Sequence, residues 1–590
     1  MRPYLNSAIK IEPFRLLLSP ILRRSSSSSS SIRTFTFRNF QFPTGTRAPG
    51  HLILRRCRCR AMGTSSLEAV VRFQVKDKIE LTEIEKKIFD RLLNTLLHFN
   101  LQTELRVAGG WVRDKLLGKD CYDIDIAIDN MLGSEFVDKV REYLLSTGEE
   151  AQGLCIIPRN PDQSKHLETA RMRLFDLWID FVNLRSEDYS DGSRIPTMKF
   201  GTAKEDAFRR DLTINSLFYN INTSSVEDLT GRGIEDLKTG KIVTPLPPKA
   251  TFLDDPLRVL RAIRFGARFG FILDEELKVA AACDDVTSAL AAKVSKERIG
   301  TEIDLMISGN QPVKAMTCIA DLTLFWVVFG LPPKVEPAVS EGCHKLCIAY
   351  LDASWNLIQL IGCSVFTVEQ RRLSLYAALF LPFRNITCKD EKGKTAPVVN
   401  FIFKDSLKQK SSDSETVMKI HRSLEKFLNL FDLLTSNEDT QPAEVDWGPE
   451  LIDVPFSSKL RVLAGFLLRD VKDFWRVALL ISTMIYPANI DSTEDFLDKQ
   501  YQLDKRIELF KTVENAITKL GLEKIWDVKP LVNGKEIMSV LQLKSGGPLV
   551  REWQQKLLAW QLAHPTGTAE ECLDWMKQTH LKRARIHTSS

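Results

Sequence analysis

The stretch from Leu105 to Asp129, LRVAGGWVRDKLLGKDCYDIDIAID, constrains the fold of this chain more than any other part of it. A short apolar run meets Gly109 and Gly110, a helical pattern follows, and Gly118 ends that pattern. A second β-rich run with two aspartates comes next. The stretch therefore predicts a strand, a glycine turn, a helix and a second strand.

The two aspartates of the second strand, Asp123 and Asp125, flank Ile124. Because side chains alternate between the faces of a strand, both carboxylates should point to one face of the sheet. Ile124 and Ile126 should point to the opposite face. Carboxylates this close repel each other unless a cation lies between them. Hard oxygen ligands suit Mg²⁺, which takes one or two carboxylates plus substrate phosphates.

The glycine turn complements this carboxylate pair. Gly109 and Gly110 allow close backbone approach, and the helix N-terminus after them favours an anion, with Arg113 in the first turn. A phosphate cradle beside metal-binding carboxylates is typical of two-metal phosphoryl or nucleotidyl transfer. The alternative is a solvated strand edge with a tight turn, but the combination in this order favours the catalytic interpretation.

This segment resembles motif A of the nucleotidyltransferase superfamily, in the class II branch of CCA-adding tRNA nucleotidyltransferases and bacterial poly(A) polymerases. Its amino-acid sequence is most similar to that of the eukaryotic, plant-like members of this family. The resemblance implies that Asp123 and Asp125 bind two Mg²⁺ ions and that Gly109, Gly110 and Arg113 hold a triphosphate. It also implies an α+β nucleotidyltransferase head, polymerase β-like with a mixed sheet, followed by an all-α neck, body and tail.

At 590 residues the chain is too long for one hydrophobic core. The net charge of +5 permits a polyanionic partner, and the eleven cysteines, without CxxC spacing, indicate reduced thiols of an intracellular protein. No apolar run reaches the length of a membrane span.

The expected divisions are a transit peptide (1–61), a catalytic head (66–247), a neck that recognises the base (248–310), a body (311–470) and a tRNA-binding tail (471–590).

The first 60 residues are rich in Arg and Ser and contain a single acidic residue, Glu12. This composition is typical of a mitochondrial or plastid transit peptide, although a disordered basic tail is the alternative. Met62 follows the tract. A second start there would give a form for the cytosol and nucleus.

Between the first motif and the next, helices are expected at 73–99 and 133–146, and strands at 154–158, 169–175 and 176–184. Asp180 is a candidate third metal carboxylate, and a solvated edge-strand aspartate is the alternative. A polar loop is expected at 185–202. In the resembled family a flexible loop here is thought to help change nucleotide specificity from C to A.

The segment Ala207–Phe218, AFRRDLTINSLF, matches the family motif RRDxxxN. The resemblance implies that Arg210 meets triphosphate oxygens. Asp211 and Asn215 lie four residues apart, and we expect them on one helix face, where they could hydrogen-bond a ribose 2′-OH. A capped surface helix is the alternative.

The segment DDPLRVLRAIRFGARFGF, residues 254–271, predicts a helix with arginines at intervals of three and four. Such a ridge is a phosphate or nucleic-acid surface, with Arg261 and Arg264 as candidates, or a solvated face with carboxylate partners. Asp255 and Arg258 fit the Watson–Crick edges of cytosine and adenine and should reject uracil. The pair resembles motif D, EDxxR, of the class II enzymes, with Asp254 in place of the glutamate.

Farther along, KERIGTE resembles motif E through Arg298 and Glu302, which we expect to pair with each other and brace the neck. The remainder predicts helices. A helix–turn–helix at 529–550 has a glycine turn, Gly546–Gly547, that could sit on RNA phosphates.

The resemblance implies template-independent addition of CCA to the tRNA 3′ end from CTP and ATP, with contacts to the acceptor end and elbow. The protein itself would act as the template. The alternatives are a poly(A) polymerase, a CC-only or A-only enzyme, or a non-catalytic tRNA-binding protein.

Overall fold

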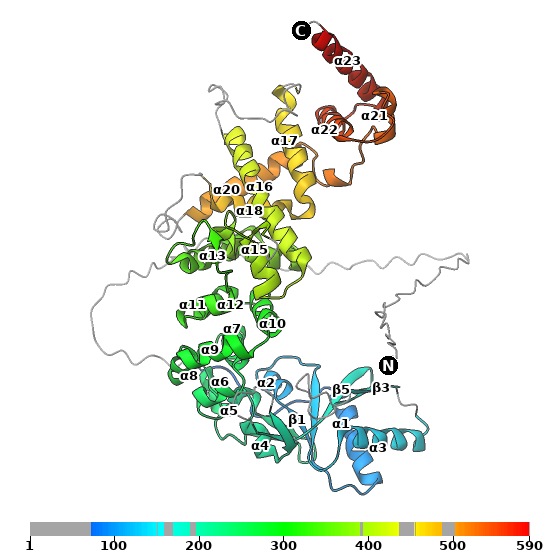
Figure 1. The fold of residues 1–590 in the computed structure, drawn as a ribbon. Helices are drawn as coiled ribbons and strands as arrows, with labels where there is room; N and C mark the ends of the chain where they lie inside the picture. The colour runs from blue at the N-terminus through cyan, green and yellow to red at the C-terminus, as the bar shows by residue number, and fades with distance from the viewer. Residues whose placement is uncertain are drawn as a thin grey trace, which may run out of the picture. The chain divides into compact units, whose positions relative to one another are not determined.

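The computed structural model describes residues 72–149, 152–157, 169–188, 196–389, 393–435, 454, 456–486 and 502–588 (Figure 1). The predicted transit peptide and Met62 lie outside the described residues. None of the helices within these ranges combines the length and the apolar character that crossing a bilayer requires.

The head is built on a seven-stranded sheet in which β2 and β5 are parallel and the other neighbouring strands antiparallel. In sheet order the strands are β3 (Gln152–Ile157), β4 (Thr169–Leu174), β5 (Leu177–Asn183), β2 (Ile124–Ile128), β1 (Leu105–Ala108), β8 (Phe218–Asn220) and β9 (Ser225–Glu227). The helices of this region are α1 (Glu83–His98), α2 (Gly110–Leu116), α3 (Gly133–Ser146), α4 (Ala203–Phe208) and α5 (Gly233–Thr239). The predicted mixed sheet is confirmed.

The two faces of this sheet have different neighbours. Ile124, Ile126, Ile179 and Phe181 are fully buried on the face where α3 packs against β4 and β5. The residues between them, Asp125 among them, are only partly covered. The predicted alternation of apolar and acidic side chains is confirmed, and the carboxylates lie on the more open face.

The helix predicted from residue 73 begins at Glu83. Thr82 caps it: its hydroxyl accepts from the Glu85 N–H (3.2 Å), and the Glu85 carboxylate accepts from the Thr82 N–H (2.7 Å). This reciprocal capping box fixes the first turn, so the apolar residues before it contribute to packing from extended chain.

The loop predicted at 185–202 is in part a β-hairpin. Strands β6 (Arg185–Asp188) and β7 (Thr197–Phe200) pair antiparallel, and residues 189–195 lie outside the described part of the chain. The hairpin was not predicted because β6 is entirely polar, and the four residues of β7 are too few for their alternation to indicate a strand.

The helix predicted to follow Asp211 is also wrong. Helix α4 (Ala203–Phe208) ends before Asp211, and between Asp211 and β8 the chain forms one 3₁₀ turn, η2 (Thr213–Asn215). The Asp211 carboxylate accepts from the Leu212 N–H (2.9 Å). This local bond competes with helical backbone pairing and favours a turn.

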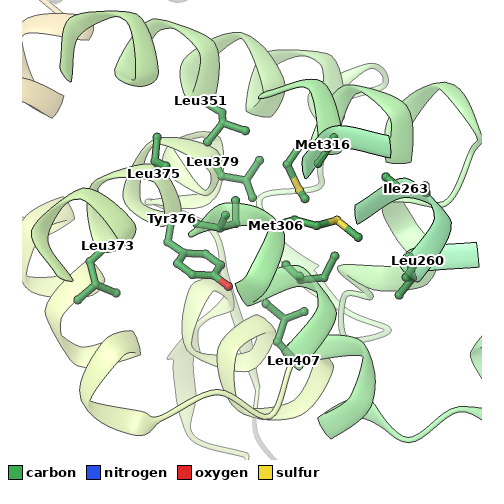
Figure 2. Close-up of a cluster of buried hydrophobic side chains, with 14 of the residues drawn as sticks. Leu260, Ile263, Met306, Met316, Leu351, Leu373, Leu375, Tyr376, Leu379 and Leu407 are labelled. Carbon is green, nitrogen blue, oxygen red and sulfur yellow. The ribbon is translucent and has the colours of Figure 1, made fainter. Parts of the chain in front are cut away.

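The neck consists of short helices whose buried residues merge with those of the body. They are α6 (Pro248–Asp254), α7 (Leu257–Phe269), α8 (Glu275–Ala281), α9 (Asp284–Lys293) and α10 (Lys296–Ile307). Figure 2 shows Met306 of α10 between Leu260 and Ile263 of α7 on one side and Tyr376 and Leu379 of α14 (Val368–Leu379) on the other. One apolar cluster therefore continues from the neck into the body.

The body and tail are predominantly helical, as predicted. Their further helices are α11 (Pro312–Asp321), α12 (Phe325–Val328), α13 (Cys343–Ile361), α15 (Val398–Phe401), α16 (Ser411–Thr435), α17 (Phe456–Val471), α18 (Trp475–Met484), α20 (Leu503–Lys519), α21 (Gly534–Val540), α22 (Pro548–Ala563) and α23 (Ala569–Thr588). Two small sheets depart from an all-α description: β10 (Lys241–Ile242) with β11 (Ile272–Leu273), and β12 (Val335–Glu336), β13 (Thr387–Lys389) and β14 (Thr395–Pro397). The predicted helix–turn–helix at 529–550 is present as α21, the glycine turn and the start of α22.

Replacing Gly300 with Ala should lower the melting temperature of the protein. In α10 a Cβ at this position would overlap the Leu407 carbonyl oxygen, and the Gly300 carbonyl accepts from Gln409 Nε2 (2.8 Å). Overpacking against backbone costs about 1–3 kcal/mol. Gly546→Ala is the matched control for calorimetry, because a Cβ there meets nothing within 4 Å. Equal melting temperatures for both variants would contradict the close approach of α10 to Leu407.

Candidate active site

Three carboxylates meet on the open face of the head sheet. Asp125 and Asp180 are register partners across β2 and β5, and one side-chain oxygen each of Asp123, Asp125 and Asp180 lies within 4.8 Å of the other two. Parallel pairing of two strands far apart in sequence thus places Asp180 with the predicted pair. Of its two sequence-based interpretations, the structure favours the third carboxylate of a cluster.

The electrostatics of this cluster suit a divalent cation. Burial, followed by the charges of Asp123 and Asp180, raises the pKa of Asp125 to about 6. Burial also raises the pKa of Asp180. Converging acidic oxygens that oppose each other's ionisation are the donor set that Mg²⁺ prefers, so the residues present fit the ion.

A cavity of about 1010 Å³ adjoins the carboxylates, and Asp123 and Asp125 line it. Eight arginines also line it: Arg113, Arg185, Arg209, Arg210, Arg258, Arg261, Arg268 and Arg298. The other acidic residues of its wall are Glu187, Asp211 and Asp255. Counting eight arginines against five carboxylates, the wall carries an excess of three positive charges, which favours a polyanionic ligand.

The two glycines of the turn have different roles. Gly109 has φ of +69°, and its N–H donates to the Leu217 carbonyl (2.9 Å), so its amide is already engaged within the head. A Cβ at Gly109 would lie 2.7 Å from Arg210 Nη1, and its absence lets that guanidinium approach. Gly110 lines the cavity as predicted.

Arg113 is buried and held from three sides. Its Nε donates to Asp114 Oδ1 (2.8 Å), its Nη1 donates to Asn215 Oδ1, and its guanidinium lies 4.7 Å from the centroid of the Phe269 ring. Phe265 lies on the same guanidinium at 5.0 Å. This rigid placement at the cavity wall agrees with the predicted anion contact.

Asp211 and Asn215 lie together as predicted, although a turn and not a helix joins them. Asn215 Nδ2 donates to Asp211 Oδ1 (3.0 Å), and Arg261 Nε donates to Asp211 Oδ2 (2.8 Å). Burial alone would raise the pKa of Asp211, but Arg261 and the Asn215 hydrogen bond outweigh it and lower the pKa to about 2. Asp211 is therefore a fixed negative charge in the wall.

The arginines of α7 have carboxylate partners, in line with the second interpretation of the ridge. Arg261 pairs with Asp211, as described above. Arg264 Nε donates to Glu302 Oε2 (2.6 Å), and Arg268 Nη2 donates to Asp114 Oδ2 (3.2 Å). Arg261 still lines the cavity, whereas Arg264 does not.

The predicted base-reading pair lies in the cavity wall, and each member has another partner. Asp255 Oδ2 accepts from Arg298 Nη2 (2.9 Å). Arg258 Nη2 donates to the Arg209 carbonyl (2.7 Å) and lies 3.6 Å from Glu187 Oε2. Asp255 is in extended backbone between α6 and α7, with Arg258 one helical turn away.

The predicted bond between Arg298 and Glu302 is wrong. Arg298 turns to Asp255, and Glu302 accepts from Arg264 and lies 3.8 Å from Arg261 Nη1. Both residues still brace the neck, but they do so by tying α10 to α7 and to the segment before it. The neighbouring helix offers buried partners that a spacing of four within one helix cannot reveal.

Sequence analysis missed the acids that hold the other arginines. Asp206 is buried; its Oδ2 accepts from Arg210 Nη2 (2.7 Å) and its Oδ1 from Arg209 Nε (2.8 Å). The spacing of three and four residues between Asp206 in α4 and the two arginines after that helix was a usable signal for these bonds. No such signal in the sequence indicated Glu187, because this residue belongs to β6 of the unpredicted hairpin. Its carboxylate lies 2.9 Å from Arg209 Nη1.

Comparison with known proteins gives consistent matches. Residues 105–243 match the family model described as the poly A polymerase head domain. The mitochondrial CCA tRNA nucleotidyltransferase of Candida glabrata is 32% identical over 543 residues, covering 86% of this chain and 97% of that protein. The tRNA nucleotidyltransferase cca2 of Schizosaccharomyces pombe is 33% identical over 512 residues, covering 85% and 99%.

A solved structure supports the fold over most of the chain. The Bacillus stearothermophilus CCA-adding enzyme in complex with CTP superposes with a TM-score of 0.54 at 18% identity, covering 86% of this chain and all (100%) of that one. The arrangement of a mixed-sheet head and a helical remainder is therefore shared.

Proposed function

The chain belongs to the CCA tRNA nucleotidyltransferase family, and we propose that it adds C, C and A to the 3′ end of tRNA from CTP and ATP without a nucleic-acid template. One observation carries this proposal: a carboxylate cluster fit for Mg²⁺ borders an arginine-lined cavity that also contains Asp255 and Arg258. The metal cluster, the phosphate-binding surface and the base-reading pair thus share one site.

In this proposal Asp123, Asp125 and Asp180 hold two Mg²⁺ ions. Bound there, the ions lower the pKa of the primer 3′-hydroxyl and stabilise charge on the α-phosphate. The primer 3′-oxygen forms the new bond to the α-phosphorus as the bond to pyrophosphate breaks. The three carboxylates would hold the ions from one sheet face.

The triphosphate is held by Gly110, Arg113 and Arg210, with Arg261 as a further phosphate contact. Arg113 and Arg210 are fixed beforehand by Asp114 and Asp206. A guanidinium already in place loses little rotational freedom when the nucleotide binds.

The ribose and base contacts come from separate pairs. Asp211 and Asn215 receive the ribose 2′-hydroxyl and select ribonucleotides. Asp255 accepts from the exocyclic amino group of cytosine or adenine, and Arg258 donates to the ring nitrogen. Arg298 positions Asp255 for this contact.

The RNA partner is tRNA, with its acceptor end in the head and its elbow on the body and tail. We assign the form starting at Met1 to mitochondria or plastids and a form starting at Met62 to the cytosol and nucleus. The Candida glabrata relative is named as mitochondrial. Imaging of reporter fusions of both forms tests the assignment, and a single shared location would overturn it.

The activity test uses the Met62 form, tRNA lacking its 3′ end, Mg²⁺, and each labelled nucleotide alone and combined. Two C residues from CTP and one A only after ATP is added are the expected products. Long A tails on any RNA would instead assign a poly(A) polymerase. Bound tRNA without incorporation would leave a non-catalytic binding protein.

A further inference from the structure

The open face of the head sheet continues beyond the carboxylates onto β4 and β5, where it carries Arg171, Arg173 and Trp178. We name these three residues the β4–β5 platform. We propose that the platform binds the last nucleotides of the RNA primer, with one base stacked on Trp178. The inference rests on the proposed function and assigns the surface that brings the primer to the reaction.

The platform begins beside the metal cluster. Trp178 and Asp180 lie on the same face of β5 two residues apart, about 7 Å along the strand. Arg171 is the register partner of Asp180, and Arg173 is the register partner of Trp178. A nucleotide seated on Trp178 therefore lies directly beside the carboxylates.

Trp178 is fixed in place and yet open to solvent. A Cβ at Gly153 of β3 would lie 2.9 Å from Trp178 Cη2, so the indole lies against the backbone of the edge strand. Gly153 also has φ of +52°. Even so, Trp178 is 42% exposed. A large aromatic ring held on an open sheet is how sheet-based RNA-binding modules stack bases.

The charges of the platform suit a phosphate backbone. Arg171 Nε lies 2.7 Å from Asp180 Oδ1, and the Arg171 guanidinium lies 5.7 Å from the centroid of the Trp178 ring. Arg173 Nη2 lies 3.0 Å from Asp176 Oδ1. Both arginine side chains remain more than 40% exposed, at 41% and 43%, and can meet phosphate oxygens.

The platform is separate from the nucleotide cavity. Asp123 and Asp125 line that cavity, whereas none of the three platform residues does. The platform is therefore a surface beside the carboxylates that the nucleotide cavity does not include. In-line displacement places the primer hydroxyl and the pyrophosphate leaving group on opposite sides of the α-phosphorus, so the primer must reach the carboxylates from outside the triphosphate site, and the platform offers a surface for it there.

Trp178→Ala should raise KM for tRNA ending in CC by about 10- to 100-fold, because losing one base–aromatic stack weakens binding by that order. KM for ATP should not change. Trp178→Phe should restore most of the RNA affinity, because phenylalanine also stacks. The control is Leu145→Ala, which removes an exposed apolar side chain (62%) of α3, the helix on the opposite face of the sheet. An unchanged KM for RNA in Trp178→Ala, or an equal effect in Leu145→Ala, would overturn the proposal.

A binding measurement separates failure of the platform from failure of the proposed function. With 2-aminopurine as the terminal base of the RNA, binding to the wild type should quench its fluorescence by stacking, and Trp178→Ala should abolish the quenching. Circular dichroism and melting of each variant exclude misfolding. If the wild type quenches but never extends the RNA, the platform stands and the proposed reaction is wrong. If the wild type extends the RNA but the quenching is absent, or is the same in Trp178→Ala, the proposed role of the platform is wrong.

Discussion

Asp125→Asn is expected to slow nucleotide addition by at least about 10³-fold while leaving the fold intact. The carboxylate is one of three converging ligands, and loss of metal-based charge stabilisation removes several kcal/mol of transition-state stabilisation. Single-turnover assays with saturating tRNA and CTP measure the effect. Asp138→Asn, which replaces a half-buried carboxylate on α3 away from the cluster, is the matched control. Turnover near that of the wild type would show that the metal assignment is wrong.

The same substitution should stabilise the protein when Mg²⁺ is removed. The pKa of Asp125 is raised from 3.8 to about 6, so the folded state holds a proton that the unfolded state has released. The contribution of Asp125 to the free energy of unfolding therefore falls between pH 3.8 and 6, by about 3 kcal/mol in total. Above pH 6 in EDTA, Asp125→Asn should melt at a higher temperature than the wild type. Added Mg²⁺ should raise the melting temperature of the wild type more than that of the variant.

Asp255→Asn is expected to let the protein incorporate uridine. An amide in place of the carboxylate offers a donor to O4 of uracil, where Asp255 has only acceptors, while the N3–H of uracil still opposes the donors of Arg258. Because one of two mismatches is removed, the preference for CTP over UTP should fall by about 10- to 100-fold. Competition assays with labelled CTP and UTP measure the ratio of kcat/KM.

Arg298→Met separates recognition from positioning at this site. It removes the 2.9 Å partner of Asp255 and leaves the carboxylate itself unchanged. We expect lower kcat/KM for both CTP and ATP without a gain of UTP. Uridine incorporation by Arg298→Met but not by Asp255→Asn would contradict the assignment of Asp255 as the base-reading group.

The parts of the site predicted correctly from the sequence are those that one stretch of chain specifies. Alternation along β2 placed Asp123 and Asp125 on one face, and close spacing placed Asp211 next to Asn215. The family resemblance supplied the head and the helical remainder. Each of these depends on contacts within a few residues or on motifs with fixed spacing.

The errors in side-chain pairing concern partners that are distant in sequence. The sequence around Arg298 does not indicate that its guanidinium bonds Asp255, 43 residues earlier, and not Glu302. The exposed Trp178 likewise gains meaning only from Gly153 on the neighbouring strand. Choice among competing buried carboxylates depends on how helices and strands pack, which the pattern of one segment does not contain.

Helix α10 has ion pairs at both ends, and this has a consequence for how the parts of the protein respond to ligands. Near its start Arg298 holds Asp255, and near its end Asp304 accepts from Arg372 of α14 (2.6 Å), which also bonds Asp413 of α16 (2.7 Å). A ligand that draws Asp255 away from Arg298 therefore acts on a helix that the body also holds. If RNA bound to the body changes the affinity for the nucleotide by some factor, thermodynamic reciprocity requires that the nucleotide change the affinity for RNA by the same factor.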